Sequence, residues 1–363
     1  MKILCFIDSL GSGGAQRQIV GLALGFKKNG HEVTFLTYHS QDFYEPILIE
    51  NDIEVNCIQE TNYLKRMFIL RKFIRKANCD VLLSFLTSCN FIAEISGLPF
   101  RSWKLVVGER NANPKILTST KLKLFRWLHF FSDYVVSNSH ENIKMVQKVS
   151  PLISKKKLKV IYNLLDLKKW SPKEGFEFLS KNKIQILVAA SHIHRKNLLG
   201  LVKALSFLNE DESSKIQIDW YGDGCAEPYF DSSFQKASEL IKKYNLERII
   251  NFYPATDEIS EKIKSADVVA LFSFNEGLPN ILCEGMACGK LVLSSNVSDI
   301  PKIINNKNLI FNPNDAQSIK NTFKYLISLN KEKFIKEGVI NRTFAEANFD
   351  EGNIVNQYLK LFK

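Results

Sequence analysis

The sequence predicts an α/β protein with two Rossmann-like, doubly wound domains that face each other across a cleft. Three observations support this. At 363 residues with 45% hydrophobic content, the chain is long for a single core. Short apolar runs alternate with amphipathic helical stretches, which is typical of parallel strands buried on both faces. The alternation occurs twice, once in each half of the chain.

Each half contributes six apolar runs. In the first half they are "KILCFID", "EVTFLTY", "DVLLSFL", "WKLVVGER", "DYVVSNS" and "KLKVIYN". In the second half they are "IQILVAASH", "KIQIDWYGDG", "IINFYP", "ADVVALFS", "KLVLSS" and "NLIFN". Charged residues, Pro and Gly replace this pattern after Asp166. We therefore expect domains at 1–168 and 184–349, a linker at 169–183, and a final amphipathic helix at 350–363 that could pack back on the first domain.

The positive charge lies entirely in the first half. Met1 to Trp170 carries 25 Lys+Arg against 14 Asp+Glu, whereas the remainder carries 24 against 24. This asymmetry predicts an anionic partner for the first domain. No zinc-finger, RRM-like or basic-zipper pattern supports nucleic acid as that partner.

The location of the protein is indicated by what the sequence contains. Seven cysteines without a CxxC arrangement fit reduced thiols in the cytoplasm better than disulfides. The opening "MKILCFIDSL" fits a buried strand rather than a signal peptide, because Asp8 interrupts it and no cleavage site follows. No window approaches the roughly 18 apolar residues of a membrane span.

A glycine-rich stretch, "SLGSGGAQRQ", follows the first strand. Gly11, Gly13 and Gly14 allow close approach of a ligand to the backbone before a helix whose N-terminus favours anions. A dinucleotide fingerprint would need glycine at Gln16 and an acid after the second strand. An NAD-dependent oxidoreductase is therefore the least favoured of the functions considered.

The stretch "AASHIHRKNLLGL" follows the first strand of the second half. Arg195, Lys196 and Asn197 lie near a helix start, where cations add to the helix dipole and suit a diphosphate. His192 and His194 alternate along one face, but no third ligand is near them in sequence. Polar cleft positions are favoured over a metal site.

Two glutamates occur in "FNEGLPNILCEGMACGKLV". The pattern predicts a helix from about Pro279 to Cys288 that stops at Gly289, with Glu276 in the loop before it and Glu284 inside it. The free amides of the first turn can seat a diphosphate, and the carboxylates can hold hydroxyls on either side. Each glutamate alone is more simply a solvated surface residue, but together they match the order ribose, diphosphate, sugar.

Over nearly its whole length the chain resembles the retaining glycosyltransferases of family 4, which have the GT-B fold. The resemblance rests on "GSGGAQRQ", "GHEVTFLT", "VIYNLLDLKKW", "HRKNLLGLVKAL", "YGDG", "ADVVALFS" and the glutamate motif. It implies that Glu284 holds the ribose, Glu276 contacts the donor sugar and Lys196 holds the diphosphate. The usual arginine is replaced by Ser191, and Arg195 is the candidate substitute.

The donor side implied by this resemblance is a set of residues that follow strands. It comprises Gly13, Gly14, Ser191, Arg195, Lys196, Asn197, Tyr253, Pro254, Glu276, Gly277, Leu278, Pro279, Asn280 and Glu284. The family's usual EAMA, GKP and IPE are here "EGMA", "GKL" and "IPK", and Pro254 stands where glycine is common.

The acceptor side is expected in the first domain. "VVGERNANP" resembles the ER(N) stretch of a branch that extends polyprenyl-linked oligosaccharides, which implies acceptor contacts by Glu109, Arg110 and Asn111. The residues expected to carry catalysis are Glu276, Lys196, Glu109 and Arg110. No DxD motif is evident, so we expect no metal or other cofactor, the leaving diphosphate being stabilised by amides and cations.

The expected function is transfer of a sugar from a UDP- or GDP-sugar to a lipid-linked saccharide in surface-polysaccharide assembly. A family 4 transferase with a soluble acceptor and a non-catalytic sugar-nucleotide-binding protein stay open as alternatives. Tyr63–Lys76 and Thr120–Phe131 interleave apolar and basic residues. Each alone fits an ordinary packed helix equally well. Together with the one-sided charge they favour docking on an anionic membrane, with the protein peripheral on its cytoplasmic face.

Overall fold

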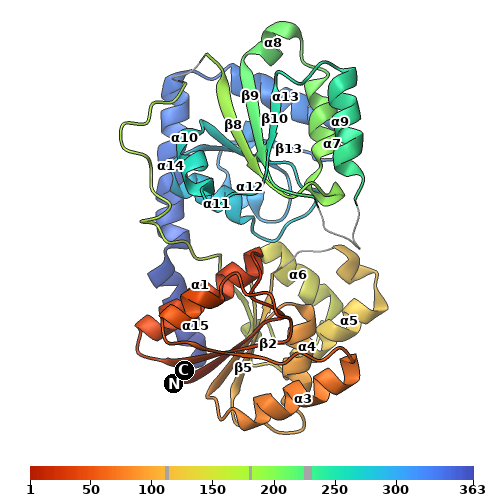
Figure 1. The fold of residues 1–363 in the computed structure, drawn as a ribbon, viewed down its shortest axis with the longest axis vertical. Coiled ribbons are helices and arrows are strands. Elements are labelled where there is room, and N and C mark those ends of the chain that lie inside the picture. The colour runs from red at the N-terminus through yellow and green to blue at the C-terminus, as the bar shows by residue number, and fades with distance from the viewer. Residues whose placement is uncertain (111–113, 180–181, 225–230) are drawn as a thin grey trace. The chain divides into compact units, whose positions relative to one another are not determined.

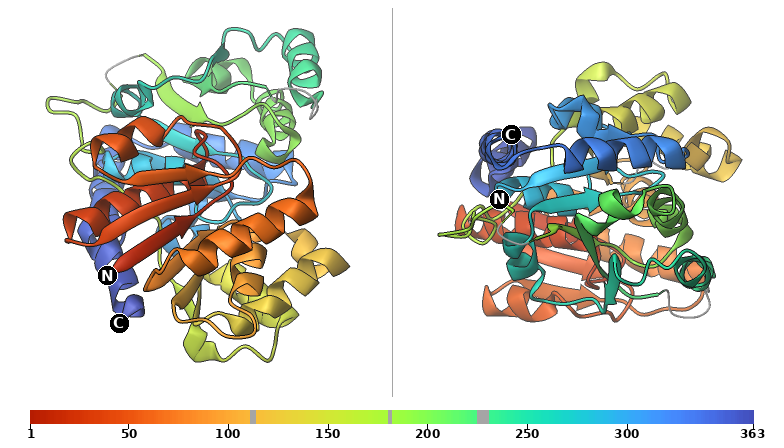
Figure 2. Two further views of the ribbon diagram at one scale, coloured as in Figure 1. Left: turned by 60° about the horizontal axis from the view of Figure 1, so that its bottom comes forward. Right: turned by 90° about the horizontal axis from the view of Figure 1, so that it is seen from above.

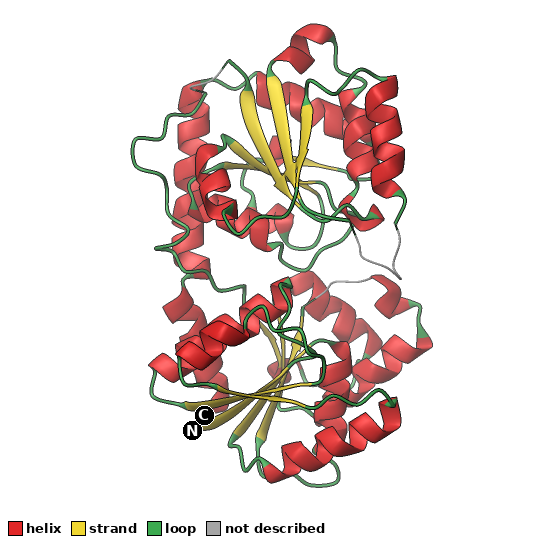
Figure 3. Cartoon of the chain, in the orientation of Figure 1, coloured by secondary structure: helices red, strands yellow, loops and turns green. Residues whose placement is uncertain are grey.

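The computed structural model of the chain describes residues 1–110, 114–179, 182–224 and 231–363. The chain divides into two compact units (Figure 1). The first comprises Met1–Leu164 with Phe349–Lys363, and the second comprises Leu165–Asn348. Each contains one parallel sheet between layers of helices (Figure 3). The predicted class of two doubly wound parallel-sheet domains is therefore confirmed.

The first unit has a seven-stranded sheet in the order β3-β2-β1-β4-β5-β6-β7. Its strands are β1 (Lys2–Phe6), β2 (Glu32–Thr37), β3 (Glu54–Cys57), β4 (Val81–Phe85), β5 (Lys104–Glu109), β6 (Tyr134–Ser137) and β7 (Leu158–Val160). Side chains of β1 point alternately to the two faces of the sheet, and both sets are apolar, so helices cover both faces. Ile3 and Cys5 belong to one core cluster, whereas Leu4 and Phe6 belong to the other.

The helices of the first unit form these two cores. α1, α2 and α15 contribute to one, and α3, α4 and α6 to the other. Figures 1 and 2 show α1 and α3 on opposite sides of the strands. The helices are α1 (Gly14–Lys28), α2 (Glu45–Glu50), α3 (Tyr63–Lys76), α4 (Thr87–Ser96), α5 (Thr120–Trp127), α6 (His140–Val149) and α15 (Glu351–Phe362). Three 3₁₀ turns accompany them: η1 (Pro114–Leu117), η2 (Leu128–Phe131) and η3 (Lys155–Lys157).

The second unit has a six-stranded sheet in the order β10-β9-β8-β11-β12-β13. Its strands are β8 (Ile184–Ala189), β9 (Ile216–Tyr221), β10 (Ile250–Tyr253), β11 (Val268–Leu271), β12 (Leu291–Ser295) and β13 (Ile310–Phe311). Its helices and 3₁₀ turns are η4 (His194–Lys196), α7 (Leu198–Leu205), α8 (Glu210–Ser214), α9 (Ser233–Lys243), α10 (Ile259–Ser265), α11 (Asn280–Ala287), α12 (Ile300–Ile303), η5 (Lys307–Leu309), α13 (Ala316–Ile327) and α14 (Lys331–Phe349).

Two segments outside the regular βα rhythm complete the units. The final helix α15 packs on α1, with the rings of Phe362 and Phe26 5.3 Å apart. The described residues of the expected linker 169–183, which are 169–179 and 182–183, belong to the second unit. Their apolar side chains explain this, because Trp170 is buried and Phe178 packs on Phe334 at 5.8 Å.

In both sheets the strand order reverses beside the first strand of the unit. β1 lies between β2 and β4, and β8 lies between β9 and β11. Ligands of open α/β sheets bind at the carboxyl ends of the strands at this point. The loops after β8 and β11 are therefore the first place to look for a site.

Candidate active site

An ion pair joins the two loops at the reversal point of the second sheet. Lys196, after β8, donates from Nζ to Oε1 of Glu276, after β11, at 2.7 Å. Arg195 reaches the other oxygen of Glu276 at 3.5 Å. The Lys196 and Glu276 side chains are only 17% and 11% exposed, so the pair is partly shielded from water. Residues predicted from two separate motifs thus meet at one point.

The backbone that presents these cations is fixed from both sides. The Phe274 amide donates to the Arg195 carbonyl at 2.9 Å, and the His194 ring stacks on Phe274 at 5.2 Å. Asn197 adopts a left-handed conformation and caps α7, accepting from the Gly200 amide and donating to the Pro313 carbonyl. The Asn197 side chain is buried and committed to these bonds. Asn197 is therefore the N-cap of α7, and its contact with the donor stays a prediction.

Helix α11 places Glu284. The helix runs over Asn280–Ala287, one residue shorter at each end than the sequence predicts, with Pro279 as its N-cap and Gly289 in the left-handed region after it. Leu278 is buried just before the helix, and Glu284 is only 3% exposed. α11 begins at Asn280, four residues after Glu276. Its first-turn amides therefore follow closely in sequence on the carboxylate that pairs with Lys196.

Gly285 explains one departure from the usual family motif. A Cβ at this position would lie 2.8 Å from the Cβ of Val269 on β11. The absence of a side chain lets α11 approach the sheet closely. The "EGMA" sequence therefore fits the packing of this particular strand.

Two tyrosines end neighbouring strands of the same sheet. Tyr221 and Tyr253 are the last residues of β9 and β10, and their rings stack at 4.8 Å with an angle of 18°. Tyr253 was expected on the donor side with Pro254, which follows it. Tyr221 was missed, because only the parallel pairing of β9 with β10 places it opposite Tyr253. The pair offers a flat aromatic surface, 38% exposed at Tyr253.

The remaining polar residues after β8 contact aromatic rings. His192 stacks on Phe234 at 4.3 Å, and burial lowers the pKa of its imidazole. Ser191 accepts a bond from the Ile193 amide through its carbonyl, so the turn is held by backbone. Among residues 1–110, 114–179, 182–224 and 231–363, no group of three His, Cys, Asp or Glu side chains could hold a metal.

The glycine-rich loop of the first unit forms the start of α1. Gly13 is the N-cap and Gly14 the first helical residue, and both are exposed. Neither has a positive φ. Their exposure leaves the first amides of α1 accessible. Gln16 donates to Asp8 at 3.0 Å, which ties the helix start to the end of β1.

Glu109, the last residue of β5, lies in a buried ionic network. Its carboxylate accepts from Arg126 at 2.9 Å and contacts His129 Nε2 at 3.0 Å, and His129 Nδ1 lies 2.5 Å from Glu94. Burial opposes charge on Glu109, but the Arg126 and His129 charges lower its pKa overall. Burial also opposes charge on His129, yet the two carboxylates raise its pKa to about 9.

This network gives Glu109 an anchoring role. Its side chain is 4% exposed, and both carboxylate oxygens are paired. It anchors the end of β5 and the start of the next loop. Direct catalysis by Glu109 stays a prediction beside this anchoring role. Sequence reasoning missed Glu94, Arg126 and His129, which are distant in the chain.

Arg110 is also held within the first unit. Its guanidinium lies 3.9 Å from the Phe85 ring centroid and donates to the Tyr358 hydroxyl of α15 at 2.5 Å. Burial lowers its pKa, partly offset by Tyr358. Arg110 thus ties the loop after β5 to the final helix. Asn111, the third expected acceptor residue, lies outside the described residues.

Comparison with protein-family models gives two adjoining matches. Residues 12–169 match the model described as Glycosyltransferase Family 4. Residues 172–338 match the model described as Glycosyl transferases group 1. Together the two matches include every strand of both sheets except β1, and they include Lys196 and Glu276.

Two relatives from Campylobacter jejuni are similar along most of their length. One, a GalNAc-alpha-(1->4)-GalNAc-alpha-(1->3)-diNAcBac-PP-undecaprenol alpha-1,4-N-acetyl-D-galactosaminyltransferase, is 25% identical, with 99% of this chain and 98% of the relative covered. The other, an N-acetylgalactosamine-N,N'-diacetylbacillosaminyl-diphospho-undecaprenol 4-alpha-N-acetylgalactosaminyltransferase, is 26% identical, with 80% of each covered. Among solved structures, Anabaena HepE in complex with UDP has a TM-score of 0.85 at 18% identity, with 99% of each chain covered.

Proposed function

The chain belongs to glycosyltransferase family 4 and has the GT-B fold, and on this premise we propose that it is a retaining, metal-independent glycosyltransferase. It transfers one sugar from a nucleotide-sugar to a lipid-linked saccharide, as a step in building a surface polysaccharide. The donor binds to the second unit, and the acceptor is held from the first unit.

The ion pair between Lys196 and Glu276 carries this proposal. Without a donor, the negative charge of Glu276 balances the positive charges of Lys196 and Arg195. A donor diphosphate would bring negative charge of its own to these two cations. When the diphosphate binds, these cations move to it, and the Glu276 carboxylate becomes available to the hydroxyls of the donor sugar. The pair therefore keeps the cations placed before the donor arrives, and Arg195 takes the role of the arginine that Ser191 replaces.

Transfer then breaks one bond and forms one. The bond from the anomeric carbon to the diphosphate oxygen breaks, and an acceptor hydroxyl oxygen bonds to the same face of that carbon. The hydroxyl proton passes to the leaving diphosphate. Lys196, Arg195 and the first-turn amides of α11 stabilise the charge that develops there. Glu284 holds the ribose, and the Tyr221–Tyr253 stack suits the base.

The relatives favour a UDP-linked donor and a diphosphate-linked lipid acceptor. Both Campylobacter enzymes act, by name, on saccharides carried by undecaprenyl diphosphate. The HepE structure holds UDP. UDP-N-acetylgalactosamine with an undecaprenyl-diphosphate saccharide is thus the first pair to test.

Membrane docking fits the surface of the first unit. No helix within the described parts of the chain is both long and apolar enough to cross a bilayer. α3 and η2 both pack on α4, so both basic, apolar segments adjoin the same helix of the unit. The most exposed apolar side chains on these segments are those of Leu64, Phe68, Leu124, Trp127 and Phe130.

The structure reduces the number of cations available for this docking. Arg71 donates to the Ile95 and Leu98 carbonyls, and Arg75 to the Ser96 carbonyl, at the end of α4. Lys72 and Lys76 remain exposed. The docking face therefore combines apolar insertion with these lysines, whereas Arg71 and Arg75 stabilise the fold.

The proposal is tested by a transfer assay. The protein is incubated in EDTA with UDP- and GDP-sugars and a synthetic undecaprenyl-diphosphate saccharide, and the product is weighed by mass spectrometry. A mass increase of one sugar, with retained anomeric configuration by NMR, is expected for a UDP-sugar. Transfer only to a soluble acceptor would favour the alternative. Loss of activity in EDTA, restored by Mn²⁺, would contradict metal independence.

A further inference from the structure

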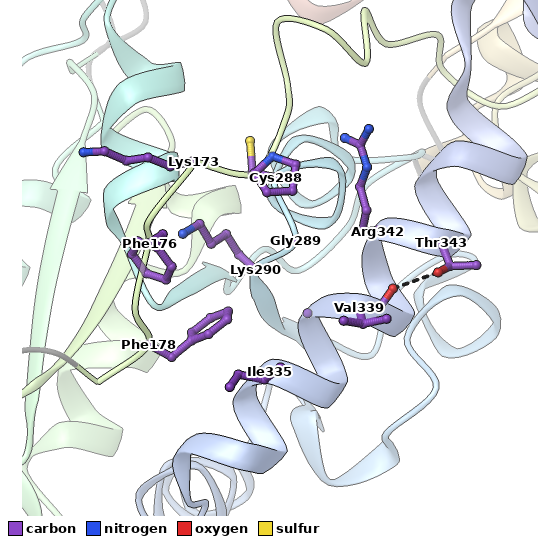
Figure 4. Close-up of a pocket in the computed structure, with 12 residues that line it drawn as sticks. Lys173, Phe176, Phe178, Cys288, Gly289, Lys290, Ile335, Val339, Arg342 and Thr343 are labelled. Carbon is purple, nitrogen blue, oxygen red and sulfur yellow. Dashed lines mark hydrogen bonds between the residues drawn. The ribbon is translucent and has the colours of Figure 1, made fainter.

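A pocket lies within the second unit at the amino end of β12, away from the carboxyl ends of the strands that carry the donor residues. Its volume is about 260 Å³, and Figure 4 shows its lining. Phe176 and Phe178 form one wall, α14 contributes Ile335 and Val339, and Gly289 and Lys290 lie between them. Lys290 immediately precedes β12.

The pocket combines positive charge with apolar walls. Its charged lining residues are Lys173, Lys290 and Arg342, and none of its twelve described lining residues is acidic. Glu346 balances Arg342 in part, from 2.7 Å. The Phe176 and Phe178 rings meet edge to face at 5.0 Å, and Val339 is 61% exposed. Such a lining favours an anion attached to an apolar body.

Lys290 is a buried cation with little compensation. It is 1% exposed, donates to the Lys264 carbonyl at 2.7 Å and lies 3.0 Å from the Phe176 ring centroid. Burial lowers its pKa to about 7. Asp267 and Cys288 oppose this shift and Lys173 adds to it. An anion in the pocket would stabilise the charged form.

The same residues hold the end of the donor helix α11. The last four carbonyls of α11 all accept hydrogen bonds. The Cys288 amide donates to the Glu284 carbonyl, the Lys290 amide to that of Gly285, and the Gly289 amide to that of Met286. The Arg342 guanidinium donates to the Ala287 carbonyl. The distances are 2.9 Å for the three amides and 2.6 Å for Arg342. All four donors line the pocket. One eight-residue helix, about 12 Å long, thus joins the donor site to the pocket.

We propose that this pocket is an effector site, which binds a phosphate or carboxylate carried on a single apolar ring and thereby changes the affinity of the donor site. The volume fits this ligand class. An engineered cavity of about 150 Å³ accommodates benzene, and drug-sized pockets begin at about 300 Å³. The change in donor affinity rests on the proposed donor site, whereas binding of the ring anion in the pocket does not.

Binding is measured first, without any nucleotide. Phenyl phosphate and benzoate are titrated into the protein and followed by ligand-observed NMR, with inorganic phosphate and benzyl alcohol as anion-only and ring-only controls. We expect phenyl phosphate, benzoate or both to bind, and both controls to bind more weakly. The tighter of the two ring anions identifies whether the pocket prefers phosphate or carboxylate. No binding by either ring anion, or equal binding by inorganic phosphate, would overturn the proposal.

The site is assigned with a matched pair of variants. Val339 is exposed, so Val339→Glu and Val339→Gln should both fold, yet only the first adds a negative charge to the pocket. Val339→Glu should weaken the ring anion about tenfold relative to Val339→Gln. Equal affinity in the two variants would place the ligand elsewhere and refute the assignment.

Coupling is measured by titrating UDP with and without saturating ring anion. At a ring-anion concentration that just saturates wild type, we expect the UDP affinity to change at least threefold in wild type and by less in Val339→Glu, with the reciprocal effect of UDP on the ring anion. Ring-anion binding without any change in UDP affinity would overturn the effector role. Absence of UDP binding itself would instead count against the proposed donor site.

Discussion

The buried network around His129 makes the stability of the first unit depend on pH. His129 is 2% exposed between Glu94 and Glu109, and its pKa in the folded protein is about 9 against 6.5 for the free side chain. A raised pKa stabilises the fold fully below pH 6.5, and this contribution is lost as the pH rises through 9. The difference corresponds to about 3 kcal/mol.

The perturbation is His129→Gln, a neutral side chain that keeps hydrogen-bonding capacity. At pH 6 the variant should be less stable than wild type by about 3 kcal/mol, because the paired carboxylates lose their cation. Toward pH 10 the difference should shrink. Exposed His39 in the same unit provides the control, since His39→Gln should show no such trend.

The assay is hydrogen exchange followed by mass spectrometry, corrected for the intrinsic rate at each pH. Peptides that cover β5 report the first unit separately from the second, so the measurement stays local. The reasoning would be refuted if the difference in protection between wild type and His129→Gln were constant from pH 6 to pH 10.

Three other predictions follow from packing and charge. Gly285→Ala should destabilise the second unit by about 1–3 kcal/mol in urea unfolding, because its Cβ would overlap Val269, and Val269→Ala should recover part of the loss. Burial lowers the pKa of Lys290 from 10.5 to about 7, so its destabilisation of the fold is fully present below pH 7 and falls as the pH rises toward 10.5. Lys290→Met should therefore gain more stability over wild type at pH 7 than at pH 10 in thermal unfolding. Replacing Lys72 and Lys76 with Gln should weaken binding to anionic liposomes by about 2 kcal/mol, roughly thirtyfold, at low salt. Gln at the exposed Lys236 and Lys243 of α9 should have no effect, and equal loss in both pairs would contradict the docking face.

The sequence was sufficient for features that depend on local patterns. Buried strands such as "ADVVALFS" are recognisable because they are apolar on both faces, and β11 is found there. Helix α11 was predicted to within one residue at each end from Pro279 and Gly289. The glutamate spacing and the Arg195–Lys196 pair marked the donor loops, because residues after parallel strands gather at one edge of a sheet.

Contacts between distant segments could not be predicted in this way. Glu109 looks like an accessible acid after a strand, and only the folded unit brings His129 and Arg126 against it. Asn197 looks like a ligand contact, yet its left-handed backbone makes it a cap. Arg71 and Arg75 read as surface charges, although the loop after α4 occupies them. Each depends on the packing of one element against another rather than on a local pattern.

If Lys196 leaves Glu276 for the donor diphosphate, calorimetric titration of UDP into Lys196 and Glu276 variants will detect the exchange. Lys196→Met should weaken UDP about tenfold or more, because a charge-assisted bond is lost. Glu276→Gln should bind UDP at least as tightly as wild type, since the competing carboxylate is gone, while its transfer rate with a UDP-sugar falls. Wild-type UDP affinity in Lys196→Met, or equal loss of UDP affinity in both variants, would contradict the account.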